Sequence, residues 1–206
     1  MRRILVFLIA FSSPALAQQT DPVATRSKGR ADAPVTVYEM ADFQCPVCRQ
    51  FTLTVWPTIE REYVQTGKVR WVFVNFPLTR IHPNAVAAAQ VAMCAARQAK
   101  FWPVHDKLYQ SQPQWAPQSD PGPTLLAVAE SAGVDRHALE SCVESKATLA
   151  VVDQDAQGAM RSGAGGTPDF YIEGGLLDGA VPVDDFRHIL DSVYLAKSGP
   201  TPAPRR

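Results

Sequence analysis

The chain has 206 residues, of which 46% are hydrophobic, and this is enough apolar material for one folded domain with a substantial core. Lysine plus arginine equals aspartate plus glutamate at 20 each, so there is no excess of basic charge to bind nucleic acid or an anionic membrane surface. We therefore expect partners that are selected by shape and chemistry, with no nucleic acid among them.

The first residues have the pattern of a cleavable export signal. The basic start Met1-Arg2-Arg3 precedes an apolar run from Ile4 to Phe11 that is too short to span a bilayer. Ala15-Leu16-Ala17 then places small residues where a signal peptidase cuts, so residues 1–17 are expected to be removed after Ala17. An uncleaved membrane anchor is the alternative, and it would need a longer apolar run. Export would place the protein in the periplasm or a similar compartment.

Two strands are predicted in the segment that follows. Residues rich in β-branched and aromatic side chains form Val35–Met40 and Val69–Phe76. With a helix between them, they would make a right-handed βαβ unit with parallel strands. Residues 18–33 are polar without a sustained period and are predicted to be an N-terminal arm, which could pack on the domain or stay free. Order is expected to begin at Pro34.

A helix is predicted between these strands. Its apolar positions recur at helical spacing and would form one buried face; they are Cys48, Phe51, Val55 and Ile59. Pro57 lies inside this pattern and has no N–H to donate to the Leu53 carbonyl, so we expect a kink there. Cys45 would lie at or just before the N-terminus of this helix.

Strand signals vanish after residue 81, and helical patterns follow one another. The predicted helices cover residues 85–97, 102–109, 125–131, 136–143 and 147–160, with a proline-rich loop at 112–123. These elements predict a helical subdomain at 82–162.

Strand character returns near the end of the chain. Residues 169–173 and 176–178 predict an antiparallel hairpin that turns at Gly174-Gly175, and a last helix is expected after Pro182. The sequence therefore predicts an α/β fold with the following parts: an α/β domain at 34–81 and 163–197, the inserted helical subdomain at 82–162, and an unstructured tail at 198–206.

The motif Cys45-Pro46-Val47-Cys48 lies where the first strand meets the first helix, and a pair with this spacing in an α/β pattern indicates redox chemistry. A cysteine at a helix N-terminus faces unpaired amide protons, which lowers its pKa. Cys45 is therefore the predicted nucleophile, and Cys48, one turn further on the buried face, is the predicted resolving thiol. A zinc site is the alternative, but no further ligands lie at suitable spacing, so no metal is expected.

Several segments between residues 29 and 196 resemble the DsbA-like thiol-disulfide oxidoreductases. The matching stretches are Asp32-Ala33-Pro34-Val35-Thr36, Asp42-Phe43-Gln44-Cys45-Pro46-Val47-Cys48, Asn75-Phe76-Pro77-Leu78, His82-Pro83-Asn84-Ala85, Lys100-Phe101-Trp102 and Gly166-Thr167-Pro168. The resemblance implies a thioredoxin-like fold with the helical insertion and no cofactor. It also implies exported cysteine-containing proteins as substrates, a membrane reoxidant of the quinone-linked DsbB type, and, as we expect, a monomer.

Four further site residues are expected: Val47, Thr167 and Pro168 in substrate binding, and Glu39 in catalysis. Pro168, after Thr167, corresponds to the family's cis-proline, whose loop lies beside the disulfide and offers backbone groups to an extended peptide. A trans proline at the start of an edge strand is the alternative. Val47, between the cysteines, is expected at the same substrate-binding surface. Glu39 is expected to be a buried acid that exchanges a proton with Cys48, unless it is a strand-end residue turned to water.

The remaining cysteines, Cys94 and Cys142, are predicted to form a structural disulfide, with a second redox pair as the alternative. The predicted function is the introduction of disulfide bonds into exported proteins. A reductase or isomerase on the same fold is the first rival, although residues 18–33 are too short for the N-terminal dimerisation domain of the family's isomerases. A binding or chaperone module with a merely structural CxxC disulfide is the second.

Overall fold

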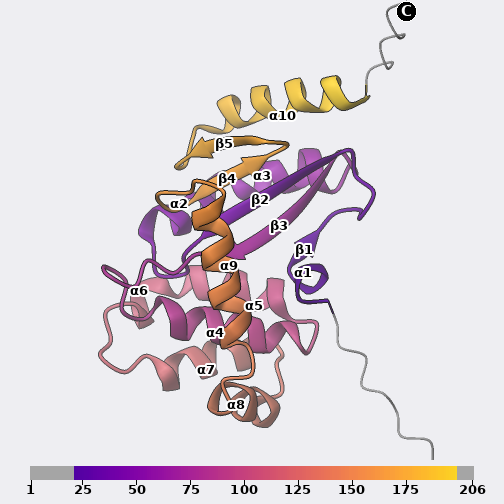
Figure 1. Cartoon of the computed structure of the whole chain (residues 1–206). Helices are drawn as coiled ribbons and strands as arrows, with labels where there is room; N and C mark the ends of the chain where they lie inside the picture. The colour runs from indigo at the N-terminus through magenta and orange to yellow at the C-terminus, as the bar shows by residue number, and fades with distance from the viewer. Residues whose placement is uncertain (1–20, 199–206) are drawn as a thin grey trace, which may run out of the picture.

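A five-stranded sheet forms the centre of this computed structural model, which describes residues 21–198 (Figure 1). Its strands lie in the order β1-β3-β2-β4-β5, where β2 and β3 are parallel and all other neighbours are antiparallel. The parallel pair is the predicted βαβ unit, and β4 with β5 is the predicted hairpin. The strands are β1 Ser27–Lys28, β2 Val35–Ala41, β3 Val69–Asn75, β4 Asp169–Ile172 and β5 Gly175–Asp178.

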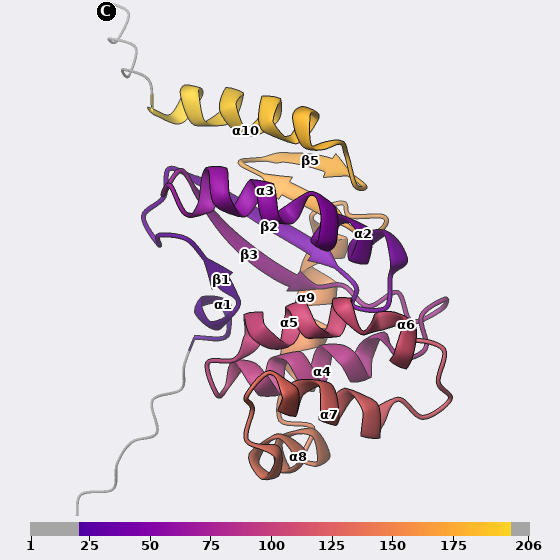
Figure 2. The ribbon, with the colours of Figure 1, turned by 180° about the vertical axis from the view of Figure 1, so that it is seen from behind.

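Helices cover the two faces of the sheet unequally (Figures 1 and 2). One face packs against α2 (Pro46–Thr54), α3 (Trp56–Ile59), the π-helical turn η1 (Glu60–Val64) and α10 (Val183–Ser198). On the other face, α9 (Leu149–Arg161) crosses the sheet. The first layer is filled by buried aromatic rings, since alternate strand residues point toward the helices; they are Phe51, Trp56, Trp71, Phe170 and Phe186.

Between β3 and β4 the chain forms the predicted helical insertion, which packs below the sheet in the view of Figure 1. The alanine-rich helix α4 is almost wholly buried because its small side chains let α5, α7, α8 and α9 approach it closely. The insertion consists, besides α9, of α4 Ala85–Ala96, α5 Phe101–Gln110, α6 Gln112–Trp115, α7 Gly122–Ser131 and α8 Arg136–Glu144.

The prediction that order begins at Pro34 is wrong. The chain forms a short helix α1 (Pro22–Thr25), and β1 then pairs with the free edge of β3. Arg26 forms a buried ion pair with Asp155 of α9 at 2.6 Å. These partners lie far away in the sequence, so the local polar composition of the arm gives no sign of them.

The helix after the cysteines is interrupted, as Pro57 predicts, but the break lies at Val55. The position agrees with the steric effect of proline, whose ring meets the carbonyl one turn earlier in the helix. The predicted loop at 112–123 is partly helical, because α6 places Trp115 in the core and its indole N–H donates to the Leu108 carbonyl. Its formation depends on that tertiary contact.

The hairpin turn is displaced by one residue from the prediction. Ile172 pairs with Gly175, so the turn residues are Glu173 and Gly174, both with positive φ, while Gly175 belongs to β5. A two-residue turn with positive φ at both positions suits the twist of the hairpin.

The predicted signal peptide, residues 1–17, lies outside the described residues, as do residues 199–206 of the predicted tail. Ser198, the first residue of that predicted tail, ends α10. Within residues 21–198, no helix has both the length and the apolar character needed to cross a membrane.

Candidate active site

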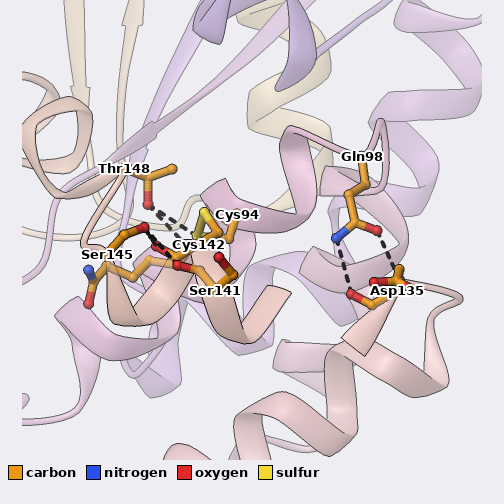
Figure 3. The surroundings of a disulfide bond; sticks show 8 residues. Cys94, Gln98, Asp135, Ser141, Cys142, Ser145 and Thr148 are labelled. Atoms are coloured by element: carbon orange, nitrogen blue, oxygen red, sulfur yellow. Dashed lines mark hydrogen bonds between the residues drawn. A yellow bond between two sulfur atoms is a disulfide. The ribbon is translucent and has the colours of Figure 1, made fainter. Parts of the chain in front are cut away.

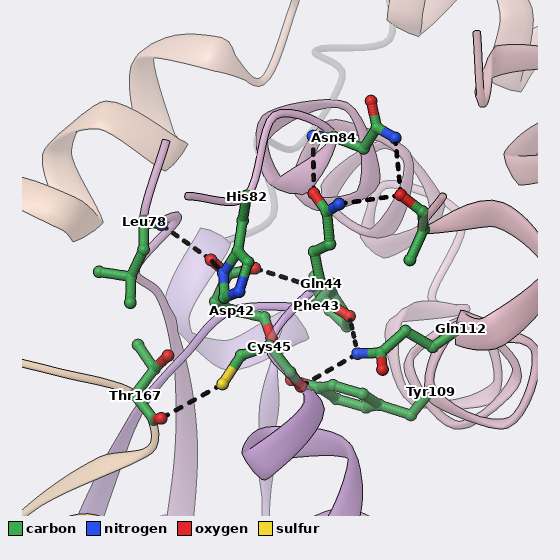
Figure 4. A network of polar contacts seen from close by, with 11 residues as sticks. Asp42, Phe43, Gln44, Cys45, Leu78, His82, Asn84, Tyr109, Gln112 and Thr167 are labelled. Atoms are coloured by element: carbon green, nitrogen blue, oxygen red, sulfur yellow. Dashed lines mark hydrogen bonds and ion pairs between the residues drawn. The ribbon is translucent and has the colours of Figure 1, made fainter. Parts of the chain in front are cut away.

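The cysteine motif lies where β2 leads into α2, as the sequence predicts (Figure 4). Cys45 is the N-cap residue of α2, and Pro46 lies in its first turn. Proline is tolerated there because the backbone N–H groups of the first turn have no acceptor within the helix. Both thiols are free in this structure and both cysteines are buried, whereas Val47 between them is 43% exposed. Both sulfurs therefore lie at the N-terminal end of α2, and the apolar side chain of Val47 points to solvent between them.

The surroundings of Cys45 favour its thiolate. Its pKa is lowered to about 6, first by a hydrogen bond from the Cys48 thiol, and further by the Thr167 side chain and the backbone N–H groups of Cys48 and Val47. Burial acts in the opposite direction, because it disfavours the charged sulfur. Cys45 is thus the more acidic thiol, as expected for a cysteine at a helix N-terminus.

The environment of Cys48 has the opposite effect. Its pKa is raised well above the ordinary value, first by burial and then by the neighbouring sulfur of Cys45. Hydrogen bonds donated to the sulfur by the backbone N–H of Asp42 and by the Thr167 side chain oppose this shift only in part. Cys48 therefore keeps its proton at neutral pH, and a base is needed to remove it.

The loop before β4 lies directly against Cys45. The Cys45 thiol donates to the Thr167 carbonyl with a sulfur-oxygen distance of 3.3 Å, and the Thr167–Pro168 peptide bond is cis. The carboxylate of Asp169 accepts hydrogen bonds from three glycine N–H groups, which holds the loop in place; the donors are Gly165, Gly166 and Gly179.

Glu39 is buried in the middle of β2, in agreement with its position on the strand, and only 2% of its surface is exposed. The indole Nε1 of Trp71 donates to its Oε2 at 2.8 Å. Its Oε1 has no hydrogen-bond partner within residues 21–198. Burial raises the pKa of Glu39 to about 7, although the bond from Trp71 opposes the shift.

A buried aspartate, for which no role was expected, organises the segment before the cysteines. Asp42 accepts the N–H groups of Gln44 and Leu78 at 2.7 and 2.8 Å, and its Oδ2 lies 2.8 Å from Nδ1 of His82 (Figure 4). It thereby joins the cysteine loop to the chain that follows β3. Asp42 and His82 both lie within motifs that carry the resemblance, which was the available signal.

Amide and phenol groups connect the same loop to the helical insertion. Gln112 donates from Nε2 to the carbonyls of Phe43 and Cys45 at 2.7 and 3.0 Å. The Tyr109 hydroxyl donates to the Asp42 carbonyl at 3.3 Å. The carbonyls of Asp42 and Cys45 also accept the backbone N–H groups of Cys45 and Arg49, whereas the Phe43 carbonyl relies on Gln112. The insertion therefore completes the hydrogen bonding of the loop before α2.

The second cysteine pair lies away from this site. Cys94 of α4 and Cys142 of α8 form a disulfide with Cα atoms 5.8 Å apart (Figure 3). The Thr148 hydroxyl is 3.6 Å from the Cys94 sulfur. Nearby, Gln98 and Asp135 exchange two hydrogen bonds that join the end of α4 to the start of α8. The pair therefore links two helices of the insertion.

A dithiol pair at a helix N-terminus, beside a cis-proline loop and above a sheet of this topology, defines the thioredoxin-fold class of redox sites. The chain matches the family model described as Thioredoxin over residues 21–192. No group of three His, Cys, Asp or Glu side chains placed to hold a metal occurs in the part of the chain that the structure describes.

Three known proteins illustrate the similarity. The probable disulfide bond formation protein D of Bacillus anthracis is 33% identical over 153 residues, which cover 73% of this chain and 70% of that protein. Na(+)/H(+) antiporter NhaA 3 of Salinispora tropica is 35% identical over 75% of this chain, but the chain spans only 22% of the antiporter's length. BdbD from Bacillus subtilis has a similar fold, with a TM-score of 0.74, 24% identity, and coverage of 82% of this chain and 92% of that one.

The chain therefore belongs to the DsbA-like thiol-disulfide oxidoreductases.

Proposed function

We propose that the chain introduces disulfide bonds into exported proteins in the periplasm, with Cys45 and Cys48 as its redox-active pair. The observation that supports this best is the contrast between the two thiols: the pKa of Cys45 is lowered to about 6, while the pKa of Cys48 is raised well above its ordinary value. A stabilised thiolate favours the reduced pair, and this makes the corresponding disulfide a better oxidant.

The exchange proceeds in two steps. A substrate thiolate attacks the Cys45 sulfur of the oxidised pair, which forms a mixed disulfide and releases Cys48 as a thiolate that takes up a proton. A second substrate thiolate then attacks the substrate sulfur of the mixed disulfide and releases the Cys45 thiolate, whose low pKa makes it a good leaving group. The substrate has lost two electrons, and the pair has gained them.

Glu39 is the proposed partner for the proton of Cys48. A carboxyl group with a pKa of about 7 is divided between its two protonation states at neutral pH, so it can both give and accept a proton. Its burial supports this role, because a solvent-exposed carboxylate would be fully ionised.

The proposed substrate surface is the cis-proline loop. The Thr167 carbonyl lies beside the Cys45 sulfur, and an extended peptide could pair with the backbone there as an added strand. Val47 would contribute an exposed apolar contact next to the sulfur. We further propose that the protein acts as a monomer and that a quinone-linked membrane protein of the DsbB type reoxidises it.

Measurement of the reduction potential against glutathione tests the oxidase proposal. We expect a value toward the oxidising end of the span of about −270 to −120 mV known for such proteins. A value near −270 mV would favour a reductase. An inert disulfide in both this titration and an insulin reduction assay would favour a binding module.

The nucleophile should be visible in a pH titration. We expect the thiolate absorbance of the reduced protein to rise with a midpoint near pH 6, and alkylation of Cys45 to slow as the pH falls through that value, because the reactive thiolate is lost. Cys45→Ser should remove the transition, since Cys48 stays protonated in this range. A midpoint above 8 would contradict the assigned role.

Val47→His should make the protein more oxidising. A histidine at this position could place a charge or a donor near the Cys45 sulfur, which the valine cannot do. Each unit by which the pKa of Cys45 falls corresponds to ~1.4 kcal/mol, or about 30 mV in a two-electron potential. Thiolate absorbance and glutathione titration measure the two quantities, with Val47→Leu as the uncharged control. If both quantities stayed unchanged, this side chain would not govern Cys45.

A further inference from the structure

Glu39 and Trp71 form a polar contact inside the aromatic layer. They lie on the adjacent parallel strands β2 and β3, where Val37 is the partner of Trp71 and Glu39 is the partner of Phe73. The two side chains therefore meet diagonally on the face that packs against α2. Nε1 of Trp71 lies 2.8 Å from Oε2 of Glu39, and both residues are fully buried.

The indole ring is held in one orientation by its neighbours. Its centroid lies 4.7 Å from that of Trp56 and 6.2 Å from that of Phe51, with which it is stacked. Phe170 and Phe186 enclose it from β4 and α10, each with its centroid at 5.8 Å. The direction of the N–H group is therefore set by packing before any chemistry takes place.

The donor-only character of indole decides which carboxyl oxygen can carry the proton. Because the indole nitrogen cannot accept a hydrogen bond, Oε2 of Glu39 must remain an acceptor in both protonation states. The carbonyl-type oxygen of a carboxylic acid is the better acceptor, so this contact favours the acid proton on Oε1, the oxygen that has no partner within residues 21–198. The contact with Trp71 thus makes Oε2 the hydrogen-bond acceptor and leaves Oε1 as the oxygen that exchanges the proton.

Other ionisable groups lie near this contact. Burial raises the pKa of Tyr109 of α5 well above its usual range, and the charges of Cys48, Glu39, Asp42 and Cys45 raise it further, in agreement with their place in one buried region. Within the described part of the chain, Trp71 is the group that donates a hydrogen bond to Glu39.

The charged residues of the neighbouring strands point elsewhere. Arg70 and Asp169 are adjacent in sequence to Trp71 and Phe170, and alternation along a strand turns them to the other face of the sheet. Arg70 contacts Ser27, and Asp169 holds the glycine loop. No charged side chain of β3 or β4 therefore replaces the indole as a partner of Glu39.

We propose that Trp71 is a positioning residue for the proton relay: its indole N–H binds Oε2 of Glu39, confines the transferred proton to Oε1, and sets the pH range in which Glu39 serves Cys48. This inference rests on the proposed function, in which Glu39 exchanges a proton with Cys48. It adds the residue that controls this exchange without touching the sulfurs.

The step that Trp71 controls is the resolution of a mixed disulfide at Cys45 during reoxidation. Oε1 of Glu39 has no direct hydrogen-bond partner within residues 21–198, so we propose that the proton of the Cys48 thiol reaches ionised Glu39 through one bridging water. The resulting thiolate attacks the Cys45 sulfur. The Cys45–Cys48 bond forms, the bond to the reoxidant's sulfur breaks, and the reoxidant leaves as a thiolate with the electron pair. A hydrogen bond to a carboxylate is stronger than one to a carboxylic acid, so Trp71 favours the form of Glu39 that accepts the proton.

The contact can be tested first in the unaltered protein. With the Cys45–Cys48 pair oxidised, so that neither thiol titrates, the indole Nε1–H resonance of Trp71 should shift with pH at the same midpoint as the Glu39 carboxyl, near 7. The indole of Trp115, which donates to a backbone carbonyl, is the internal control and should not follow this midpoint. A Trp71 resonance that does not follow Glu39 would overturn the inference.

Trp71→Phe then removes the donor while keeping an aromatic ring. We expect the midpoint of Glu39, measured by carboxyl infrared absorption, to rise by about one to two pH units, the size of a hydrogen bond to a charged group. The rate of resolution, measured with a mixed disulfide of glutathione at Cys45, should require a correspondingly higher pH. At pH 7 this rate should fall about fivefold or more, the loss of ionised Glu39 that a shift of at least one unit produces.

Trp56→Phe is the matched control, because it makes the same change in the neighbouring ring and does not touch Glu39. It should lower stability by a similar packing loss and leave both the Glu39 midpoint and the resolution rate unchanged. If Trp56→Phe shifted the midpoint as much as Trp71→Phe, the effect would come from packing and the inference would fail.

Glu39→Gln separates this inference from the function on which it rests. It should slow resolution and remove its pH dependence, and adding Trp71→Phe to it should have no further effect on the rate. If Glu39→Gln slows resolution but Trp71→Phe alone changes neither midpoint nor rate, only the role of Trp71 is refuted. If Glu39→Gln leaves the rate unchanged, the relay itself is refuted and this inference falls with it.

Discussion

Cys48→Ala should leave the protein covalently joined to its partners and unable to complete a catalytic cycle. Cys45 remains a low-pKa nucleophile at the start of α2, so it can still attack a disulfide of a partner protein, form a mixed disulfide and release the partner's other sulfur as a thiolate. The buried thiol that would resolve that bond is absent, and the complex therefore persists. We expect complexes with several exported proteins on non-reducing gels and a complete loss of multiple-turnover oxidation.

The matched variant is Cys45→Ala, which should trap no partner, because the raised pKa of Cys48 and its burial make it a poor nucleophile. Both variants should be purified from the native compartment and compared with the wild type after alkylation of free thiols. Equal trapping by the two variants, or trapping through Cys48 alone, would reverse the roles assigned here.

Removal of the second cysteine pair should have the largest effect on stability. The bond between Cys94 and Cys142 has a sequence separation of 48 residues, and closure of such a loop stabilises the folded state by at most ~4 kcal/mol on the chain-entropy estimate. We therefore expect Cys94→Ala/Cys142→Ala to lower the free energy of unfolding by up to this amount, measured by denaturant titration with the catalytic pair kept oxidised.

Each single variant should lose nearly as much as the double variant, because either one removes the same crosslink. Thiol counting on the wild type should also find Cys94 and Cys142 still bonded after mild reduction that opens Cys45–Cys48. The rate of exchange at Cys45 should not change in the double variant. A large loss of that rate would indicate instead that the second pair passes electrons to the first.

Much of the architecture could be predicted from local patterns. The strands β2 and β3, the helix that starts at Pro46, the hairpin and most helices of the insertion follow from periodicity and turn residues. These signals work because the side-chain repeats of a helix and a strand depend on the backbone of neighbouring residues. The place of Cys45 at a helix N-terminus follows in the same way, since it needs only the end of one strand and the start of one helix.

Other features arise only when distant segments meet. The strand β1 exists because β3 offers a free edge and Asp155 offers a partner for Arg26, 129 residues away. The bonds from Leu78 and His82 to Asp42, and the indole that holds Glu39, likewise join positions that are 32 to 40 residues apart. A buried polar group is stable only when it has a hydrogen-bond partner in the folded chain, and the sequence around that group does not indicate which distant residue the partner is. The sequence therefore indicates which residues carry the redox chemistry, while tertiary packing decides which groups surround them and so where their pKa values lie.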